Sequence, residues 1–143
     1  MDIFVIAAVV IAEHRLLLVR KKGTLHFMLP GGKPLPQEGD VACLTREVDE
    51  ELGAMVRPAS LRFLGAFRAN SANEPGMRVH AHVYEVALEN EPAARGEIEE
   101  IRWMSMGVRD GIQLAPLVSG EILPYLAARS RANSASSGRA ITP

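Results

Sequence analysis

Apolar residues come in short runs along the first part of the chain, separated by polar turns and by glycine and proline. Residues 3–12 are apolar throughout and rich in β-branched side chains, which is typical of a strand buried on both faces. Polar residues 13–15 predict a turn, and the apolar run 16–19 predicts the second strand of a hairpin. A further short strand is predicted over residues 27–29. It should end at residues 30–32, because proline lacks an amide donor and two glycines permit unusual dihedrals.

An amphipathic helix is predicted in the next part of the chain. Asp40 is a suitable N-cap for a helix that runs to Leu52, and Gly53 favours a stop just past its end. At about 100° per residue, four apolar side chains of this helix form one stripe, which we expect to face the core. The stripe consists of Val41, Leu44, Val48 and Leu52.

The second half of the chain alternates apolar runs with loops. Three strands are predicted, over residues 61–67, 79–86 and 98–104. Pro116 can open a terminal helix that reaches about Ala128, and Pro124 should kink or split it. Residues 129–143 are rich in Ser, Ala and Arg without periodicity, so we expect a flexible tail after a single domain of residues 1–128.

Composition narrows the class of protein. The chain has 143 residues with 16 basic and 17 acidic side chains, so its net charge of −1 argues against a globally basic nucleic-acid binder. A hydrophobic content of 48% excludes wholesale disorder. The longest apolar run is half of the roughly 20 residues that span a bilayer, so no membrane association is expected. Cys43 is the single cysteine and cannot form an internal disulfide. We therefore expect a cytoplasmic domain.

Three glutamates share one face of the predicted helix. Glu47, Glu50 and Glu51 lie beside the apolar stripe, whereas Asp49 lies on its other side. A hydrated acidic surface would explain them, since like charges repel only weakly in water. The alternative is a site for a divalent cation, and oxygen ligands without His or Cys favour Mg²⁺ or Mn²⁺ over zinc.

The spacing around these glutamates resembles the Nudix box, G-x5-E-x7-R-E-U-x-E-E-x-G-U, in which U is a bulky aliphatic residue. All seven fixed residue types of that motif are matched. They are Gly32, Glu38, Arg46, Glu47, Glu50, Glu51 and Gly53. Ala54 stands where a larger aliphatic residue is usual, which concerns packing rather than chemistry. Residues 29–32 and 97–103 also look like companions of the motif.

The resemblance implies a fold and a reaction. It implies an α/β/α sandwich, in which the box helix and the terminal helix flank a mixed β-sheet. It also implies an enzyme that uses Mg²⁺ or Mn²⁺ to let water attack phosphorus in a nucleoside diphosphate linked to another group. On this reading the metal ligands are Glu47, Glu50 and Glu51, with the Gly31 carbonyl and Glu97 as further candidates.

Individual roles follow from the resemblance and from helix geometry. One of the box glutamates, or a later one, would take the proton from water; of Glu97, Glu99 and Glu100 we favour Glu97. Arg46 lies one turn before Glu50 and is expected to orient that carboxylate. The candidate substrate-binding residues are Arg20, Gly32, Glu38 and His80.

Several of these neighbours also have plainer readings. Lys21 and Lys22 read as an ordinary solvated turn. His80, His82 and Tyr84 share one face of a strand, which lines a nucleoside pocket or forms the outer surface of a sheet. Cys43 reads as a small apolar filler and Trp103 as a core residue.

The resemblance implies a nucleotide substrate, whose identity is open at this point. We predict hydrolysis of non-standard nucleoside triphosphates, with nucleotide sugars or ADP-ribose as alternatives. The Pro and Tyr that mark other subgroups some fifteen residues past the box are absent, since residues 69–72 stand there. A Nudix-fold binding module without turnover is the rival from another class. We expect no stable nucleic-acid binding, and a homodimer is left open.

Overall fold

The computed structural model describes residues 2–107 and 111–141, and in that part of the chain the strands form two sheets. The strands are β1 (Asp2–Val9), β2 (Ile11–Ala12), β3 (Arg15–Lys21), β4 (Gly31–Gly32), β5 (Arg62–Asn70), β6 (Arg78–Glu85) and β7 (Ile98–Ser105). One sheet has the order β4-β1-β6-β5 and the other the order β2-β3-β7. β1 runs parallel to β6 and antiparallel to β4, so the first sheet is mixed, as predicted.

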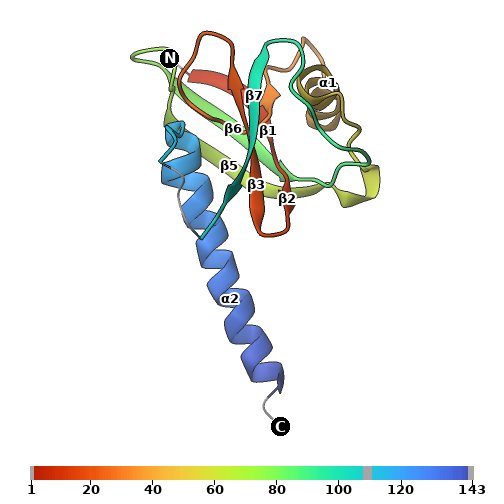
Figure 1. Cartoon of the computed structure of the whole chain (residues 1–143), viewed down its shortest axis with the longest axis vertical. Helices are drawn as coiled ribbons and strands as arrows, with labels where there is room; N and C mark the ends of the chain where they lie inside the picture. The colour runs from red at the N-terminus through yellow and green to blue at the C-terminus, as the bar shows by residue number, and fades with distance from the viewer. Residues whose placement is uncertain (1, 108–110, 142–143) are drawn as a thin grey trace.

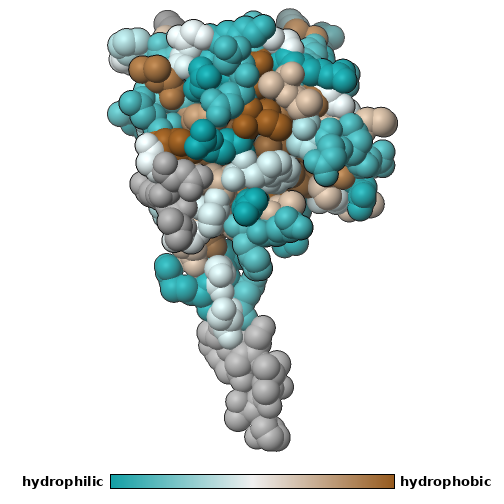
Figure 2. Space-filling view, in the orientation of Figure 1, coloured by the Kyte–Doolittle hydropathy of each residue, from teal (hydrophilic) through white to brown (hydrophobic). Residues whose placement is uncertain are grey.

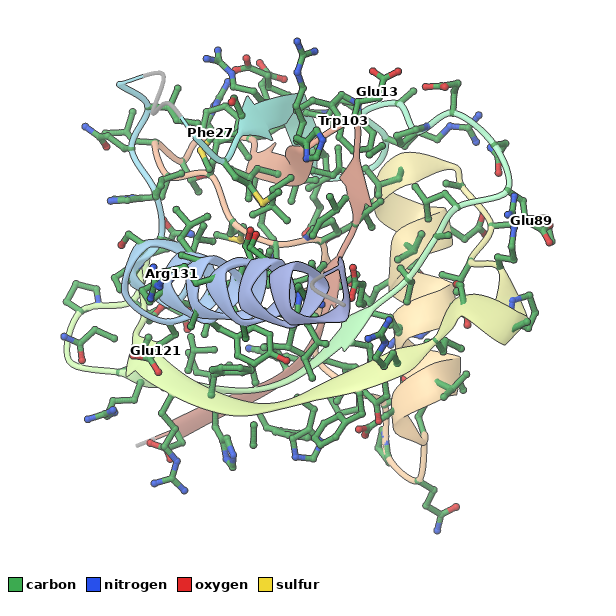
Figure 3. All side chains as sticks on the ribbon, turned by 90° about the horizontal axis from the view of Figure 1, so that it is seen from below. Glu13, Phe27, Glu89, Trp103, Glu121 and Arg131 are labelled. Carbon is green, nitrogen blue, oxygen red and sulfur yellow. The ribbon has the colours of Figure 1, made fainter. Side chains whose placement is uncertain are left out.

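Two helices lie on opposite sides of the strands (Figures 1 and 3). They are α1 (Asp40–Leu52) and α2 (Leu123–Ile141), with a short 3₁₀ turn η1 (Pro58–Ser60) between α1 and β5. Each helix covers its own apolar cluster: Leu44 and Val48 of α1 pack with Ile6 and Leu17, whereas Leu126 of α2 packs on the other side. This arrangement is the predicted α/β/α sandwich.

The hairpin and the box helix form as predicted, with one correction to the apolar stripe. Residues 13 and 14 have positive φ angles, as in a two-residue hairpin turn. Cys43, Leu44, Val48 and Leu52 are buried, but Val41 is 48% exposed, so its place in the core stripe is wrong. The first turn instead contacts the sheet through Asp40, which accepts hydrogen bonds from β6.

Two local predictions before α1 are also wrong. Residues 27–29 make only single bridges, such as Val19 with Met28, and the strand is formed by the glycines of β4. A glycine pair can be a strand here because its extended backbone fits closely against β1. Asp40 is the first residue of α1 rather than its N-cap, since Gly39 caps the helix without a side-chain hydrogen bond.

The terminal helix is longer than predicted. Helical structure begins at Pro116, passes through a π-helical turn η2 (Val118–Ile122) and continues as α2 beyond Ala128. The π turn ends two residues before Pro124, which lacks the amide hydrogen that a regular turn would use. In place of the kink predicted at Pro124, the helix contains one wide π-helical turn. The flexibility of residues 129–143 and the boundary at residue 128 stay predictions.

The surface of the described residues is typical of a folded domain. On the face shown in Figure 2, hydrophilic side chains predominate and hydrophobic patches are small, while α2 extends away from the body. Among the described helices, none combines the length and apolarity needed to cross a bilayer.

Candidate active site

The glycines of β4 bring the chain close to both β1 and α1. The Gly31 amide donates a hydrogen bond of 3.0 Å to Glu51 Oε1. Gly31 has a φ of 146°, and a Cβ there would overlap the backbone carbonyl of Ile6. Only glycine therefore fits this position.

Gly32 leaves space that a carboxylate occupies. A Cβ added to Gly32 would overlap the side-chain carboxylate of Glu47. The missing side chain lets Glu47 lie directly against the backbone of β4. The Gly32 carbonyl also faces the buried Cys43 thiol, 3.6 Å from its sulfur, and burial raises the pKa of that thiol to about 11. Cys43 is thus an uncharged filler, as expected.

Arg46 links α1 to the loop that precedes it. Its guanidinium donates two hydrogen bonds to Glu38, of 2.8 and 2.9 Å, and one of 2.6 Å to Glu47. It also donates to the Lys33 carbonyl at 3.2 Å and to Glu50 at 3.5 Å. The bonds from Arg46 lower the pKa of Glu38 to about 2, and Glu38 in turn raises the pKa of Arg46. Glu38 and Arg46 therefore form a permanent ion pair that fixes the loop before α1.

Burial makes two box carboxylates difficult to ionise. Desolvation raises the pKa of Glu47, and it raises that of Glu51 to about 7. Glu51 is only 7% exposed, and the charges of Glu47 and Glu97 further raise its pKa. Hard oxygen donors that repel one another suit a divalent cation, whose charge would stabilise their ionised forms. In the described parts of the chain, no three acidic, His or Cys side chains converge into a ready-made metal cluster.

A cavity of about 430 Å³ opens beside Glu47, whereas Glu51 is not among its lining residues. Its charged lining includes Glu47, Glu97, Lys21, Lys33 and Arg46. Apolar side chains of β1, β6 and the start of the terminal helix form another part, among them Ile3, Val5, Val79, Leu117 and Val118. A third part comes from the end of β5 and the loop after it, including Asn70 and Asn73. The cavity thus combines acids, cations and an apolar wall, as expected for a small anionic ligand with an apolar part.

A family model of the NUDIX domain matches residues 3–120 of the chain. The chain belongs to the NUDIX domain family. The predicted family is therefore confirmed, and membership supports a hydrolase that acts on pyrophosphate bonds.

The individual relatives carry names that state different activities. The mRNA-decapping protein g5R of African swine fever virus is 35% identical over 66 residues, which are 46% of this chain and 26% of the viral protein. The chain thus matches only about a quarter of that relative. MutT NUDIX hydrolase from Burkholderia pseudomallei is 23% identical, with a TM-score of 0.67 over 79% of this chain and 90% of that one. A bifunctional NMN adenylyltransferase/ADP ribose pyrophosphatase from Francisella tularensis is 21% identical, with a TM-score of 0.65 over 81% of this chain and 38% of that one. The two structural likenesses show the fold.

The loop between β6 and β7 carries Glu97 to the cavity. The amides of Ala93 and Arg95 donate to the Leu52 and Glu51 carbonyls at the end of α1, at 2.9 Å each. Arg95 also lies where a side chain on Gly53 would be. Because this loop is attached to the helix end, Glu97 lines the same cavity as Glu47.

Other predicted residues lie away from the cavity. Arg20 donates to the Thr24 carbonyl at 2.9 Å and pairs with Glu100 at 3.3 Å, so both side chains are engaged elsewhere. His80 lies on the outer face of the first sheet. Glu50 is not among the residues that line the cavity, and its side chain is 58% exposed. Their roles in binding or catalysis stay predictions.

Two cations of the Nudix cavity differ from the sequence-based expectation. Lys21 and Lys33 both line it, although the sequence predicts a solvated turn at Lys21 and no role for Lys33. Lys33 directly follows the two glycines of β4, which is a signal that could have identified it. Lys21 could not be separated from Arg20 and Lys22, because only the register of β3 decides which side chain faces the cavity.

Proposed function

We propose that this Nudix protein is a metal-dependent pyrophosphohydrolase whose substrate is a nucleoside triphosphate, and that it acts in the cytoplasm. The observation that carries the proposal is a cavity lined by the box carboxylate Glu47 together with Glu97, two lysines and an apolar wall. Its volume of about 430 Å³ is at the lower end of the range for ligand pockets, which suits one nucleoside rather than two.

The proposed metal is Mg²⁺ or Mn²⁺. Glu47, Glu97 and the Gly31 carbonyl are candidate ligands because their residues line the cavity. Glu51 is a further candidate, since its carboxylate accepts a hydrogen bond from the Gly31 amide. When bound, such an ion supplies positive charge that neutralises a diphosphate and acidifies water. Glu50 is retained as a candidate ligand from the same helix face.

The side chains of this protein would perform the remaining tasks. Lys21 and Lys33 attract the phosphates into the cavity and hold them by charge. Arg46 keeps Glu47 oriented through its 2.6 Å hydrogen bond. Glu97, which is exposed and lies on the loop that ends at β7, accepts the proton of the attacking water.

The test compares Glu51→Gln with Asp49→Asn, a matched change on an exposed residue of the same helix. Glu51→Gln should lower kcat/KM by more than about 100-fold, since a buried carboxylate is lost, while Asp49→Asn should be neutral. Circular dichroism would confirm that both variants fold. Full activity of Glu51→Gln would contradict the proposal and favour a binding module without turnover.

The substrate is tested with a panel that contains nucleoside triphosphates, ADP-ribose, a nucleotide sugar and capped RNA, each with Mg²⁺ and Mn²⁺. ADP-ribose and capped RNA are included because of the names of the structural neighbour and of the viral relative. Release of pyrophosphate from a triphosphate is the expected outcome. Turnover of a nucleotide sugar alone would refute the substrate and retain the reaction.

A further inference from the structure

Aromatic rings cluster on the face of the first sheet opposite the cavity wall. Side chains alternate along a strand, so Phe4 points away from Ile3 and Val5, which line the cavity. The ring centroids of Phe4 and His82 are 4.8 Å apart, and those of Phe63 and His82 are 5.8 Å apart. We call Phe4, Phe63, His80 and His82 the ring face.

The ring face is exposed and held in place. Phe4 is 37% exposed and Phe63 is 53% exposed, although both are large apolar side chains. Asp40 of α1 accepts hydrogen bonds from His82 Nδ1 at 2.9 Å and from the Tyr84 hydroxyl at 2.8 Å. The half-buried His82 ring contacts both phenylalanines, and large exposed apolar side chains gathered on one face of a sheet are typical of a binding surface.

Two arginines flank the rings on the same face. Arg68 on β5 is the cross-strand partner of His80, and Arg78 on β6 is the partner of Asn70. Both arginines are exposed. Of the nearby acids, Asp40 is engaged by the hydrogen bonds above, and Asp2 is the partner of Arg78 on β1. The patch therefore offers cations beside flat rings, although the whole chain has a net charge of −1.

We propose that the ring face binds single-stranded RNA, independently of hydrolysis. Rings can stack on bases while the two guanidiniums contact phosphates, and both interactions tolerate any sequence. Phe4 and His80 lie on β1 and β6, the two central strands of a four-stranded sheet, which is where RNA-binding sheets place their stacking residues. Asn70 and His80 can donate to or accept from a 2′-hydroxyl, which favours RNA over DNA.

A second copy of the chain fits this surface less well. A two-fold interface places the same patch opposite itself, which would bring Arg68 and Arg78 of both copies together. Like charges within one interface are unfavourable. Asn70 also lines the catalytic cavity, so an RNA strand on the ring face has a short path over the edge of the sheet toward it.

Fluorescence anisotropy of the full chain with a labelled twelve-nucleotide RNA carrying a 5′-hydroxyl, in EDTA, tests the proposal. RNA should bind more tightly than DNA of the same sequence. Two phosphate contacts predict a slope of log K against log salt of about −1.4. Phe4→Ala and Phe63→Ala should each weaken binding at least about fivefold, since each removes a stacking ring. Arg68→Glu should abolish binding at moderate salt.

Matched controls separate the ring face from general effects. Met55→Ala removes another exposed apolar side chain, which is 62% exposed, and Arg15→Glu reverses an exposed charge on the other sheet. Both should bind RNA like the unmodified chain. The proposal is overturned by absence of binding at 50 mM salt, by equal affinity for DNA, or by equal losses in the controls. A dimer that Phe63→Ala dissociates, without RNA binding, would identify the surface as a self-association interface instead.

Discussion

Gly32 contributes to the site through the space that its missing side chain leaves to Glu47. Gly32→Ala should lower kcat/KM at least about tenfold, because a methyl group would displace the Glu47 carboxylate. The overall stability should change little, since Gly32 has no positive φ angle. Steady-state kinetics would measure the loss of kcat/KM, and Mn²⁺ titration by calorimetry would measure metal binding at the site.

Gly39→Ala is the matched control for that substitution. A Cβ on Gly39 would meet nothing within 4 Å, and its φ of −77° suits any residue. Activity should be retained. An equal loss in both variants would show that Gly32 acts through the loop rather than through Glu47.

Glu51 makes the stability of the metal-free protein depend on pH. Burial raises the pKa of Glu51 from 4.5 to about 7, so its ionised form is unfavourable in the fold. The resulting loss of stability is absent when the pH is below the unfolded-state pKa of 4.5. It grows as the pH rises to about 7 and is complete above that pH. A rise in pKa of that size corresponds to a loss of about 3 kcal/mol in unfolding free energy.

Glu51→Gln should remove this dependence, because an amide oxygen can still accept from the Gly31 amide without carrying charge. Urea unfolding in EDTA at pH 5 and pH 8 measures the difference between the two proteins. The unmodified chain should lose stability relative to the variant at pH 8. If the unfolding free energies of the unmodified chain and of the variant depended on pH with the same slope, the assignment to Glu51 would be contradicted.

At the scale of elements, the end of α1 and the loop of residues 89–97 form one unit. Gly53 has a φ of 60°, and a side chain there would overlap Arg95. Gly53→Ala should therefore cost about 1–2 kcal/mol in unfolding free energy, partly from the backbone and partly from the displaced arginine. When Arg95→Ala is added to Gly53→Ala, it should recover only the part of this loss that comes from the displaced arginine. Urea unfolding of both single variants and the double variant gives the coupling, and strict additivity would contradict a contact between the two positions.

At the scale of the whole molecule, the terminal helix is joined to β6 by an ion pair. Arg129 donates to Glu85 at 2.6 Å, and both side chains are mostly buried. A chain truncated after Ser134 should keep its unfolding free energy. Truncation after Ala128 removes Arg129 and should cost about 1 kcal/mol.

Thermal unfolding of the two truncated chains, at equal concentrations, measures this difference. The comparison also tests the domain boundary at residue 128, since an independent domain would tolerate both truncations equally. Glu85→Gln in the full chain is the matched control, because it weakens the pair without shortening the helix. A loss on truncation after Ala128 without one in Glu85→Gln would assign the effect to helix length.

The sequence by itself determined the elements whose signals are local. Alternation and capping located α1 with its Gly53 stop and most strands to within a few residues, because these depend on neighbours along the chain. The spacing of the box residues identified the family. It also predicted that Glu47 and Glu51 share one face of the helix, because helix geometry relates residues by their spacing alone.

Tertiary structure decided what depends on contacts between distant segments. Val41 fits an apolar stripe by spacing, yet Asp40 occupies the contact with β6, so only packing could show that Val41 is exposed. The glycines of β4 became a strand because β1 lies beside them. Likewise, the register of β3 directs Lys21 rather than Arg20 into the cavity, and strand register is set by partners far away in the sequence.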